Sequence, residues 1–179
     1  MIEVGEEAPP LAGQPVFGLP FDLTRARGRG AVGVVFFGAL SSGATLDSFH
    51  RLTAIWSKLD GEQGGLVVVT RSPLEAARDF VPRHHVLFPM LVDEEGARYH
   101  TWGIGRASGV GAVFARSQPG FVRRAVSVLR NGQPLPEAHV DQAPAAFVVD
   151  RAGKVTWAWY GASVNDRVDA DSLWYAASR

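Results

Sequence analysis

Short apolar runs alternate with segments of helical period along much of this chain. The first run, Ala31 to Phe37, precedes a segment in which apolar residues recur every three or four positions. These are Leu46, Phe49, Leu52, Trp56 and Leu59. A second run, Gly65 to Thr70, is rich in β-branched residues and also precedes a helical segment. Because strands that are joined through helices pair in parallel, this order predicts an α/β protein with a central sheet.

The next elements follow the same alternation. The stretch SPLEAARDFVPRH predicts a helix with Ser72 as its N-cap, Pro73 at the first helical position and Glu75 at the capping-box position. Val86 to Asp93 predicts a further short strand, and EEGARYHTWGI predicts a short helix.

The remaining segments complete the pattern. Two apolar strands around the turn DRAG predict a hairpin, and DADSLWYAAS predicts a final helix. Gly103 to Asp141 alternates helical patches with Gly and Pro, which favours two short helices and a loop. Within the turn-rich first part of the chain, FGLPFDL is expected to contribute short edge strands.

Length and charge narrow the classes of function. We expect the 179 residues, 1–179, to form a single domain, because this length suits one hydrophobic core. The formal net charge is zero, so nothing indicates a nucleic-acid partner or an anionic membrane. The only basic cluster, Arg25 to Arg29, is expected to be a solvated loop between two strands.

The chain contains no cysteine. Disulfides, thiolate nucleophiles, zinc–thiolate sites and iron–sulfur ligation are therefore excluded. No apolar run approaches the length of a membrane span, and the acidic N-terminus lacks the plan of a signal peptide, so we expect a cytoplasmic protein. The adjacent His84 and His85 are expected at a helix end rather than on a metal, and we expect neither a metal nor a cofactor.

With its elements in this order, the chain resembles the alkyl hydroperoxide reductase/thiol-specific antioxidant superfamily, the peroxiredoxin-like proteins. The stretches that carry the resemblance are VGEEAPP, AVGVVFFGALSSGATLDSF, LVVVTRSPLEAARDF, FPMLVDEEGARYHTWGI and APAAFVVDRAGKVTWAWYG. The insert after WGIGR and the ending NDRVDADSLW are similar to the peroxiredoxin-like 2 branch. The resemblance implies a thioredoxin-like α/β fold, with a mixed central sheet, helices on both faces and a peroxiredoxin-type N-terminal extension.

The resemblance also locates the family's redox site. The signature Pro-x-x-x-Thr-x-x-Cys falls on Gly38, Ser42 and Thr45, and the Cys-x-x-Cys pair of the second branch falls on Ser42 and Thr45. Neither thiol is present, and the family's arginine before the late strand has no match. Pro144 stands in that region instead, and the resemblance implies a cis Ala143–Pro144 bond facing the turn.

The missing thiols decide against the family's reaction. Peroxide reduction needs a thiolate that can become a sulfenic acid and be resolved by a second thiol. A Ser or Thr hydroxyl stays protonated and has no equivalent oxidation states. We therefore expect a cysteine-free peroxiredoxin-like protein that lacks thiol peroxidase activity and acts by binding or association. By homology alone, the resemblance implies instead an antioxidant oxidoreductase.

Two alternatives use the same cleft for other chemistry. One is a cofactor-dependent reductase, and the other is a hydrolase with Ser41 or Ser42 as nucleophile, since ALSSG loosely resembles a nucleophile elbow. A hydrolase needs a histidine near the serine, and the histidines are scattered without a telling spacing. They are His50, His84, His85, His100 and His139. The simpler interpretation is that Ser41 or Ser42 caps the following helix.

The start of that helix is our candidate binding site. Free N–H groups, hydroxyl donors and the helix dipole together favour a water, a carboxylate or a small anion. The residues assigned to this pocket are Gly38, Ser41, Ser42, Gly43, Thr45 and Pro144. No Arg or Lys lies nearby in sequence, so we expect weak affinity.

An aromatic cluster marks the predicted hairpin. Trp157 and Trp159 share one face of the strand, and Ala158 and Tyr160 share the other. These side chains form either part of the sheet core, or a dimer surface or lipophilic ligand wall. The candidate partners are thus a second copy of the chain and a small polar or anionic ligand.

Overall fold

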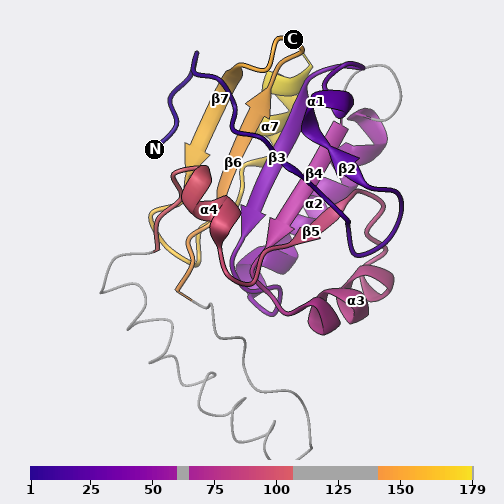
Figure 1. Ribbon diagram of the computed structural model, residues 1–179. Coiled ribbons are helices and arrows are strands. Elements are labelled where there is room, and N and C mark those ends of the chain that lie inside the picture. Colours follow the sequence, from indigo (N-terminus) through magenta and orange to yellow (C-terminus); the bar gives the residue numbers. More distant parts are fainter. Residues whose placement is uncertain (60–64, 107–140, 179) are drawn as a thin grey trace, which may run out of the picture.

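The computed structural model describes residues 1–59, 65–106 and 141–178, and its centre is a five-stranded mixed sheet (Figure 1). The strand order is β5-β4-β3-β6-β7. The strands are β3 (Val32–Phe37), β4 (Gly65–Thr70), β5 (Met90–Val92), β6 (Ala145–Val149) and β7 (Val155–Tyr160). The first three pair in parallel, and β6 is antiparallel to both β3 and β7. The predicted α/β sheet and its terminal hairpin are confirmed.

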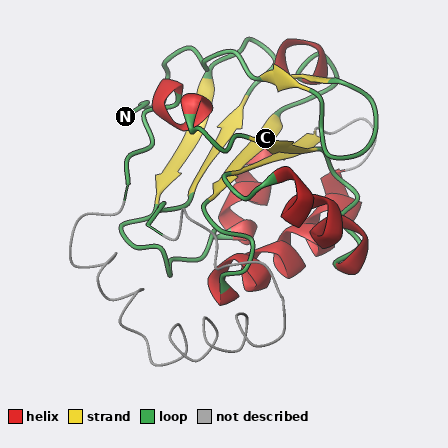
Figure 2. Cartoon of the chain, turned by 60° about the horizontal axis from the view of Figure 1, so that its bottom comes forward, coloured by secondary structure: helices red, strands yellow, loops and turns green. Residues whose placement is uncertain are grey.

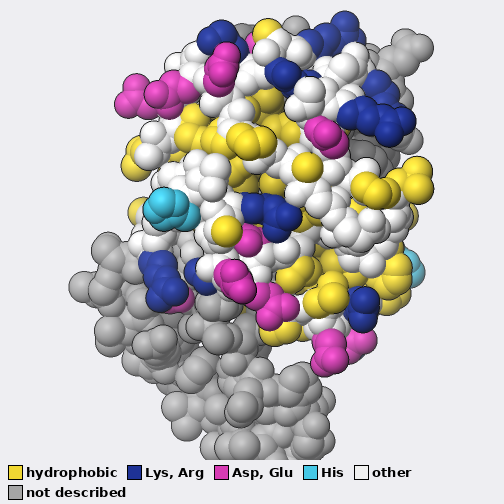
Figure 3. All heavy atoms as spheres, viewed as in Figure 1, with side chains coloured by type: hydrophobic (Ala, Val, Ile, Leu, Met, Phe, Trp, Pro, Cys, Tyr) yellow, Lys and Arg dark blue, Asp and Glu magenta, His cyan; other side chains and the backbone are white. Residues whose placement is uncertain are grey.

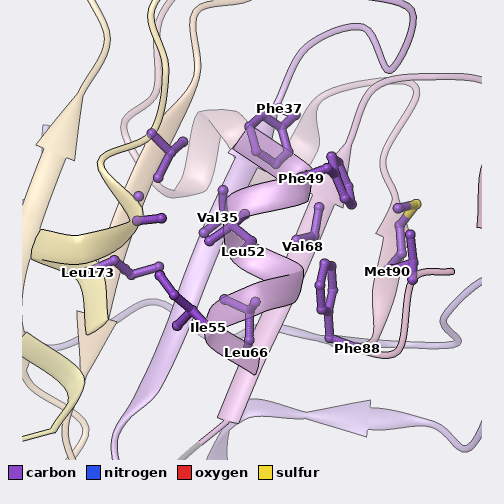
Figure 4. Packing of buried hydrophobic residues seen from close by; sticks show 14 of the residues in the cluster. Val35, Phe37, Phe49, Leu52, Ile55, Leu66, Val68, Phe88, Met90 and Leu173 are labelled. Atoms are coloured by element: carbon purple, nitrogen blue, oxygen red, sulfur yellow. The ribbon is translucent and has the colours of Figure 1, made fainter. Parts of the chain in front are cut away.

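Three longer helices cover one face of the sheet (Figure 2). They are α2 (Gly43–Leu59), α3 (Leu74–Arg83) and α7 (Ala170–Ala177). Their apolar sides meet the side chains that β3 and β4 direct to this face, and Figure 4 shows Phe49 and Leu52 of α2 packed toward Val35 and Val68. The residues Leu52, Val35 and Val68 are essentially inaccessible to solvent. Phe49 and Leu52, which recur with a helical period in the sequence, therefore lie on the side of α2 that is buried against the sheet.

Two short helices and the N-terminal segment cover the opposite face. They are α1 (Leu23–Ala26) and α4 (Ala97–Thr101), and their cluster includes Tyr99 and Trp102 against Phe36 of β3. Both faces of the central strands are buried, which explains why β3 and β4 are continuous apolar runs rather than alternating ones.

The stretch FGLPFDL contributes one short strand, as predicted, but this strand lies outside the central sheet. β1 (Ala12–Gly13) and β2 (Phe21–Asp22) pair with each other in a separate two-stranded sheet, so they do not extend the central one. The Asp22 carboxylate accepts from the N–H of Thr24 and caps α1, so part of the basic stretch after it is helical rather than loop.

The start of α3 also corrects the sequence-based prediction. The helix begins at Leu74, its N-cap is Pro73, and no side chain caps it. Ser72 instead lies outside the helix, where its hydroxyl accepts a hydrogen bond from the N–H of Leu40 at 2.9 Å. A long-range bond to another segment thus replaces the local capping box that Glu75 would complete.

The third parallel strand is shorter than predicted. Only Met90–Val92 pairs with β4, whereas Val86 to Phe88 form the connection from α3. The side chains of Val86 and Phe88 are still buried, so their apolar character reflects core packing rather than strand pairing. Most of Gly103 to Asp141, predicted as two helices and a loop, lies outside the described residues.

The surface of the described part carries both signs of charge together on the face seen in Figure 3. In the described ranges, no helix combines the length and the apolarity that crossing a lipid bilayer demands.

Candidate functional site

The candidate site is the turn that joins β3 to α2 at the carboxyl end of the central strands. The N–H of Ser42 donates to the Ala39 carbonyl at 3.3 Å, and the Ser42 carbonyl accepts from Leu46 at 3.0 Å. The Ser42 hydroxyl accepts from the N–H of Thr45 at 3.4 Å. Ser42 therefore caps α2, which begins at Gly43.

The first turn of α2 keeps free hydrogen-bond donors. Within the described residues, the N–H groups of Gly43 and Ala44 have no hydrogen-bond acceptor. A side chain added at Gly43 would meet no atom within 4 Å, and both Gly43 and Ser41 are exposed. Thr45 is only 6% exposed, so it contributes less to the surface than its neighbours do. The turn thus presents the Gly43 backbone and one accessible hydroxyl to solvent, while Ala44 is only 8% exposed.

Hydrogen bonds with residues at the end of β4 hold this turn in place. The Thr70 hydroxyl and the N–H of Arg71 both donate to the Gly38 carbonyl, at 3.1 and 3.3 Å. Ser72 accepts from Leu40 in the same turn. Thr70 and Ser72 are fully buried, so these bonds are shielded from competing water.

Tyr99 of α4 fixes the ends of β3 and β4 from the opposite face. Its buried hydroxyl hydrogen-bonds to the Phe37 carbonyl and, at 3.1 Å, to the Val69 carbonyl. Burial raises the pKa of Tyr99 well above the ordinary value, the Asp93 carboxylate adds to this, and Arg71 and the Phe37 carbonyl oppose it. The phenol therefore remains a proton donor to the strand that leads into the turn.

Arg71 connects three distant segments beside the site. Its guanidinium donates to the carbonyls of Glu94 and Glu95, at 3.1 and 3.2 Å, and to the side-chain oxygen of Gln142 at 3.3 Å. Arg71 is 6% exposed, its Nε has no partner, and no carboxylate in the described residues forms an ion pair with it. The cation is thus held by neutral oxygens rather than by a counter-charge.

Gly96 makes room for this guanidinium. A Cβ built on Gly96, whose φ is +80°, would lie 2.9 Å from the Arg71 Cζ and 3.2 Å from its Nε. Both the backbone conformation and the contact with the planar group therefore require glycine here.

Pro144 lies beside the start of the turn. In the antiparallel register Ala145 is opposite Phe36, so Pro144 is level with Phe37, one residue before Gly38. The expected cis Ala143–Pro144 bond is wrong, since the described residues contain no cis peptide bond. The Pro144 ring instead packs against Gly161, where an added Cβ would lie 3.0 Å from it.

A second arginine reaches α2 from the C-terminal part of the chain. Arg167 forms an ion pair with Asp47 at 2.9 Å, two residues after Thr45, and both side chains are largely exposed. The Ser48 hydroxyl accepts from the N–H of Val168 at 3.2 Å, which anchors this segment to the helix. Arg167 is therefore a basic group near the turn that could not be recognised from its position in the sequence. It already has an acidic partner, Asp47.

The described histidines do not complete a hydrolytic site. None of them hydrogen-bonds to Ser41 or Ser42 in the part of the chain that the structure describes. His50 and His84 lie together on α2 and the end of α3, and His100 is on α4. His139 lies outside the described residues.

The aromatic cluster on β7 divides between the two faces as predicted. Trp157 and Trp159 pack against the cluster under α2, α3 and α7, and Ala158 and Tyr160 against the opposite one. All four are partly exposed. Trp157 also lines a cavity of about 740 Å³ between α7 and the start of β7, far along the strands from the turn. Each of these four side chains therefore packs partly against the hydrophobic core and remains partly accessible to solvent.

A comparison with protein-family models identifies the family of this chain. The model of the AhpC/TSA antioxidant enzyme family matches residues 51–163, more than half of the chain. The chain belongs to this family. The matched AhpC/TSA span includes Arg71, Tyr99 and Pro144 and begins after the Ser42 turn. No curated protein is detectably similar to the chain in sequence.

Solved structures agree with the AhpC/TSA fold. Peroxidoxin BcpB from Mycobacterium tuberculosis is 17% identical, with a TM-score of 0.67 over 99% of this chain and 97% of that one. A putative thiol:disulfide interchange protein DsbE from Chlorobium tepidum is 19% identical, with a TM-score of 0.66 over 100% of both. A peroxiredoxin-like protein from Aquifex aeolicus is 13% identical, with a TM-score of 0.70 over 98% and 86%. These similarities establish a thioredoxin-like α/β fold.

Sequence reasoning located the turn but missed its supports. Ser41, Ser42, Gly43 and Thr45 lie together as predicted, whereas Tyr99, Arg71 and Gln142 were not recognised. The only available signal was a polar group, Thr70 to Ser72, directly after a buried strand.

Capping by Ser42 gives a first prediction. Ser42→Ala should lower the free energy of unfolding by about 1 kcal/mol, because it removes the acceptor for the Thr45 N–H. Ser41→Ala is the matched control, since exposed Ser41 makes no side-chain hydrogen bond in the described residues; it should change stability by less than about 0.5 kcal/mol. Urea unfolding measures both, and equal effects would rule out the cap.

The guanidinium contact gives a second prediction. Gly96→Ala should lower the free energy of unfolding by about 1–3 kcal/mol, because it forces alanine into a left-handed conformation and against Arg71. Gly43→Ala has open space and a helical position, and should be neutral or stabilising. If both variants unfold at the same urea concentration as the parent, the Arg71 contact does not constrain position 96.

The buried phenol gives a third prediction. The folded-state pKa of Tyr99 is raised, so its contribution to stability is complete below the ordinary tyrosine pKa of about 10 and is lost as pH rises above it. Tyr99→Phe should cost about 1–3 kcal/mol near neutral pH, because two buried carbonyls lose a donor. It should also flatten the alkaline decline, whereas exposed Tyr175→Phe should retain it. Unfolding curves between neutral pH and about pH 11 test this.

Proposed function

We propose that this AhpC/TSA member is a non-redox binding protein that accepts a small carboxylate or similar anion at the N-terminus of α2. The observation that carries the proposal is the pair of unpartnered N–H groups on Gly43 and Ala44, beside the exposed Ser41 hydroxyl and open space. The first turn of α2 contains no acidic side chain, so no internal carboxylate occupies this position.

Loss of the thiols supports binding rather than the family's redox reaction. Ser42 and Thr45 stand at the two positions that match the family's cysteines, and no cysteine occurs elsewhere in the sequence. A hydroxyl cannot pass through the sulfenic acid on which thiol peroxidases depend. A hydroxyl does donate and accept hydrogen bonds, which suits it to capping a helix or holding a polar ligand.

The surroundings indicate weak affinity. The Nη atoms of Arg71 already donate to carbonyl and amide oxygens, and Arg167 already pairs with Asp47. The ligand would thus gain mainly from two backbone donors, one hydroxyl and the helix dipole. Such contacts support a dissociation constant on the order of 1 mM.

Two further assignments belong to the same proposal. We assign residues 1–179 to one domain, and the β1–β2 hairpin ahead of β3 to a peroxiredoxin-type N-terminal extension. The bond from the Val16 N–H to the Met90 carbonyl and the Arg98 bond to the Ala12 carbonyl support its attachment to the fold.

The anion site gives a fourth prediction. Titration with acetate or phosphate should move the amide NMR signals of Gly43 and Ala44 saturably, whereas chloride at equal ionic strength should not. Gly43→Asp should abolish the response and also raise stability, because it places a carboxylate in the open first turn of α2. The double variant Ser42→Ala/Thr45→Val should weaken the response and lower stability.

The outcomes separate the alternatives. Absence of any saturable shift in the parent protein would mean that the hydroxyls only cap the helix. Peroxide consumption with a dithiol reductant would contradict the non-redox assignment. Labelling of Ser41 or Ser42 by a fluorophosphonate would favour a hydrolase.

A further inference from the structure

We propose that His50 and His84 form a binding site for a divalent transition-metal ion, represented by Zn²⁺, that links α2 to the end of α3. The two imidazole centres are 6.2 Å apart, with ring planes at 47°. Metal–nitrogen bonds of about 2.0–2.1 Å at a tetrahedral angle place the centres of two imidazoles on one ion roughly 5 Å apart. A rotation of the exposed His50 side chain that brings the two rings about 1 Å closer reaches this separation.

The separation of the two rings is set by the core beneath them. Phe49, next to His50, packs edge-on against Phe80 at 4.8 Å between ring centres. Phe80 in turn packs against the His84 ring at 4.2 Å. The two helices thus meet through a buried aromatic contact, and His84 is restrained by it while His50 stays exposed and adjustable. One fixed ligand and one adaptable ligand lower the cost of organising the site.

The ligand type selects the class of metal ion. A neutral imidazole offers the nitrogen lone pair that a metal ion needs. Neutral imidazole ligands without thiolates suit Zn²⁺, Ni²⁺ and Cu²⁺ rather than Mg²⁺ or Ca²⁺.

The ligand set is limited to the two histidines. No group of three or more metal-binding side chains occurs within the residues described by the structure, so water would complete the coordination. His85 follows His84 directly but has a left-handed φ of 50°, and we do not include it. The nearby Arg83 cation opposes a metal ion, so we expect an exchangeable ion rather than a permanently held one.

Binding at this position would stabilise the contact between two helices. His50 belongs to α2 and His84 is the C-cap of α3, and an ion that binds only the folded state raises the unfolding temperature. This effect is independent of the anion site, because neither histidine touches the Ser42 turn in the described residues.

The test is a calorimetric titration of the intact chain with Zn²⁺ alone, paired with thermal unfolding. The parent protein should bind one ion at this site and unfold at a higher temperature in its presence. His50→Gln should weaken binding more than tenfold and remove the temperature shift, and it should fold normally because His50 is exposed. His84→Gln should do the same, whereas His100→Gln, an exposed histidine on α4, should leave both unchanged.

Three results would overturn the proposal. One is the absence of saturable Zn²⁺ binding up to about 1 mM, and another is unchanged binding in the His50→Gln variant. The third is loss of binding in His85→Gln while His84→Gln keeps it, which would move the site off the α2–α3 contact.

Discussion

The buried guanidinium of Arg71 organises the end of the molecule at which the candidate site lies. A cation removed from water is costly unless hydrogen bonds compensate it, and here the partners are the carbonyls of Glu94 and Glu95 and the amide of Gln142. Together with Arg71 itself, these groups come from three separate parts of the sequence. Since the same residue donates its backbone N–H to Gly38, the position of the turn depends on where the guanidinium is held.

This dependence explains how the turn keeps its shape in a chain that contains no cysteine. The Gly38 and Leu40 backbone groups bond to Thr70, Arg71 and Ser72, and none of these bonds involves a redox residue. Ser42 adds a cap that a helix start requires in any case. The demands of folding alone therefore maintain the shape of this turn. The same cap uses one N–H of the first turn, which leaves fewer donors for a ligand.

The sequence predicted the helices and strands that a local pattern of apolar residues specifies. It failed where hydrogen bonds or packing with distant residues override the local pattern. β3 and β4 were recognised because buried strands require continuous apolar runs, and α2 because its apolar period matches one buried face. Ser72 was assigned to a helix cap because the local pattern fits a capping box, but a bond to Leu40 prevails in the fold. Val86 and Phe88 were predicted to be in a strand because buried connecting residues are as apolar as paired ones.

The residues that hold the site in place and the histidine pair were not predicted from the sequence for one shared reason. Tyr99, Arg71 and Gln142 act through contacts between residues 23 or more positions apart, as do His50 and His84, and no local period records such pairs. Yet each pair lies where two predicted elements meet: Tyr99 where α4 crosses the ends of β3 and β4, and His50 where α2 meets α3. Once the packing of the elements is known, a polar side chain next to a buried aromatic contact becomes informative, because the core beneath it fixes its distance to the neighbouring element.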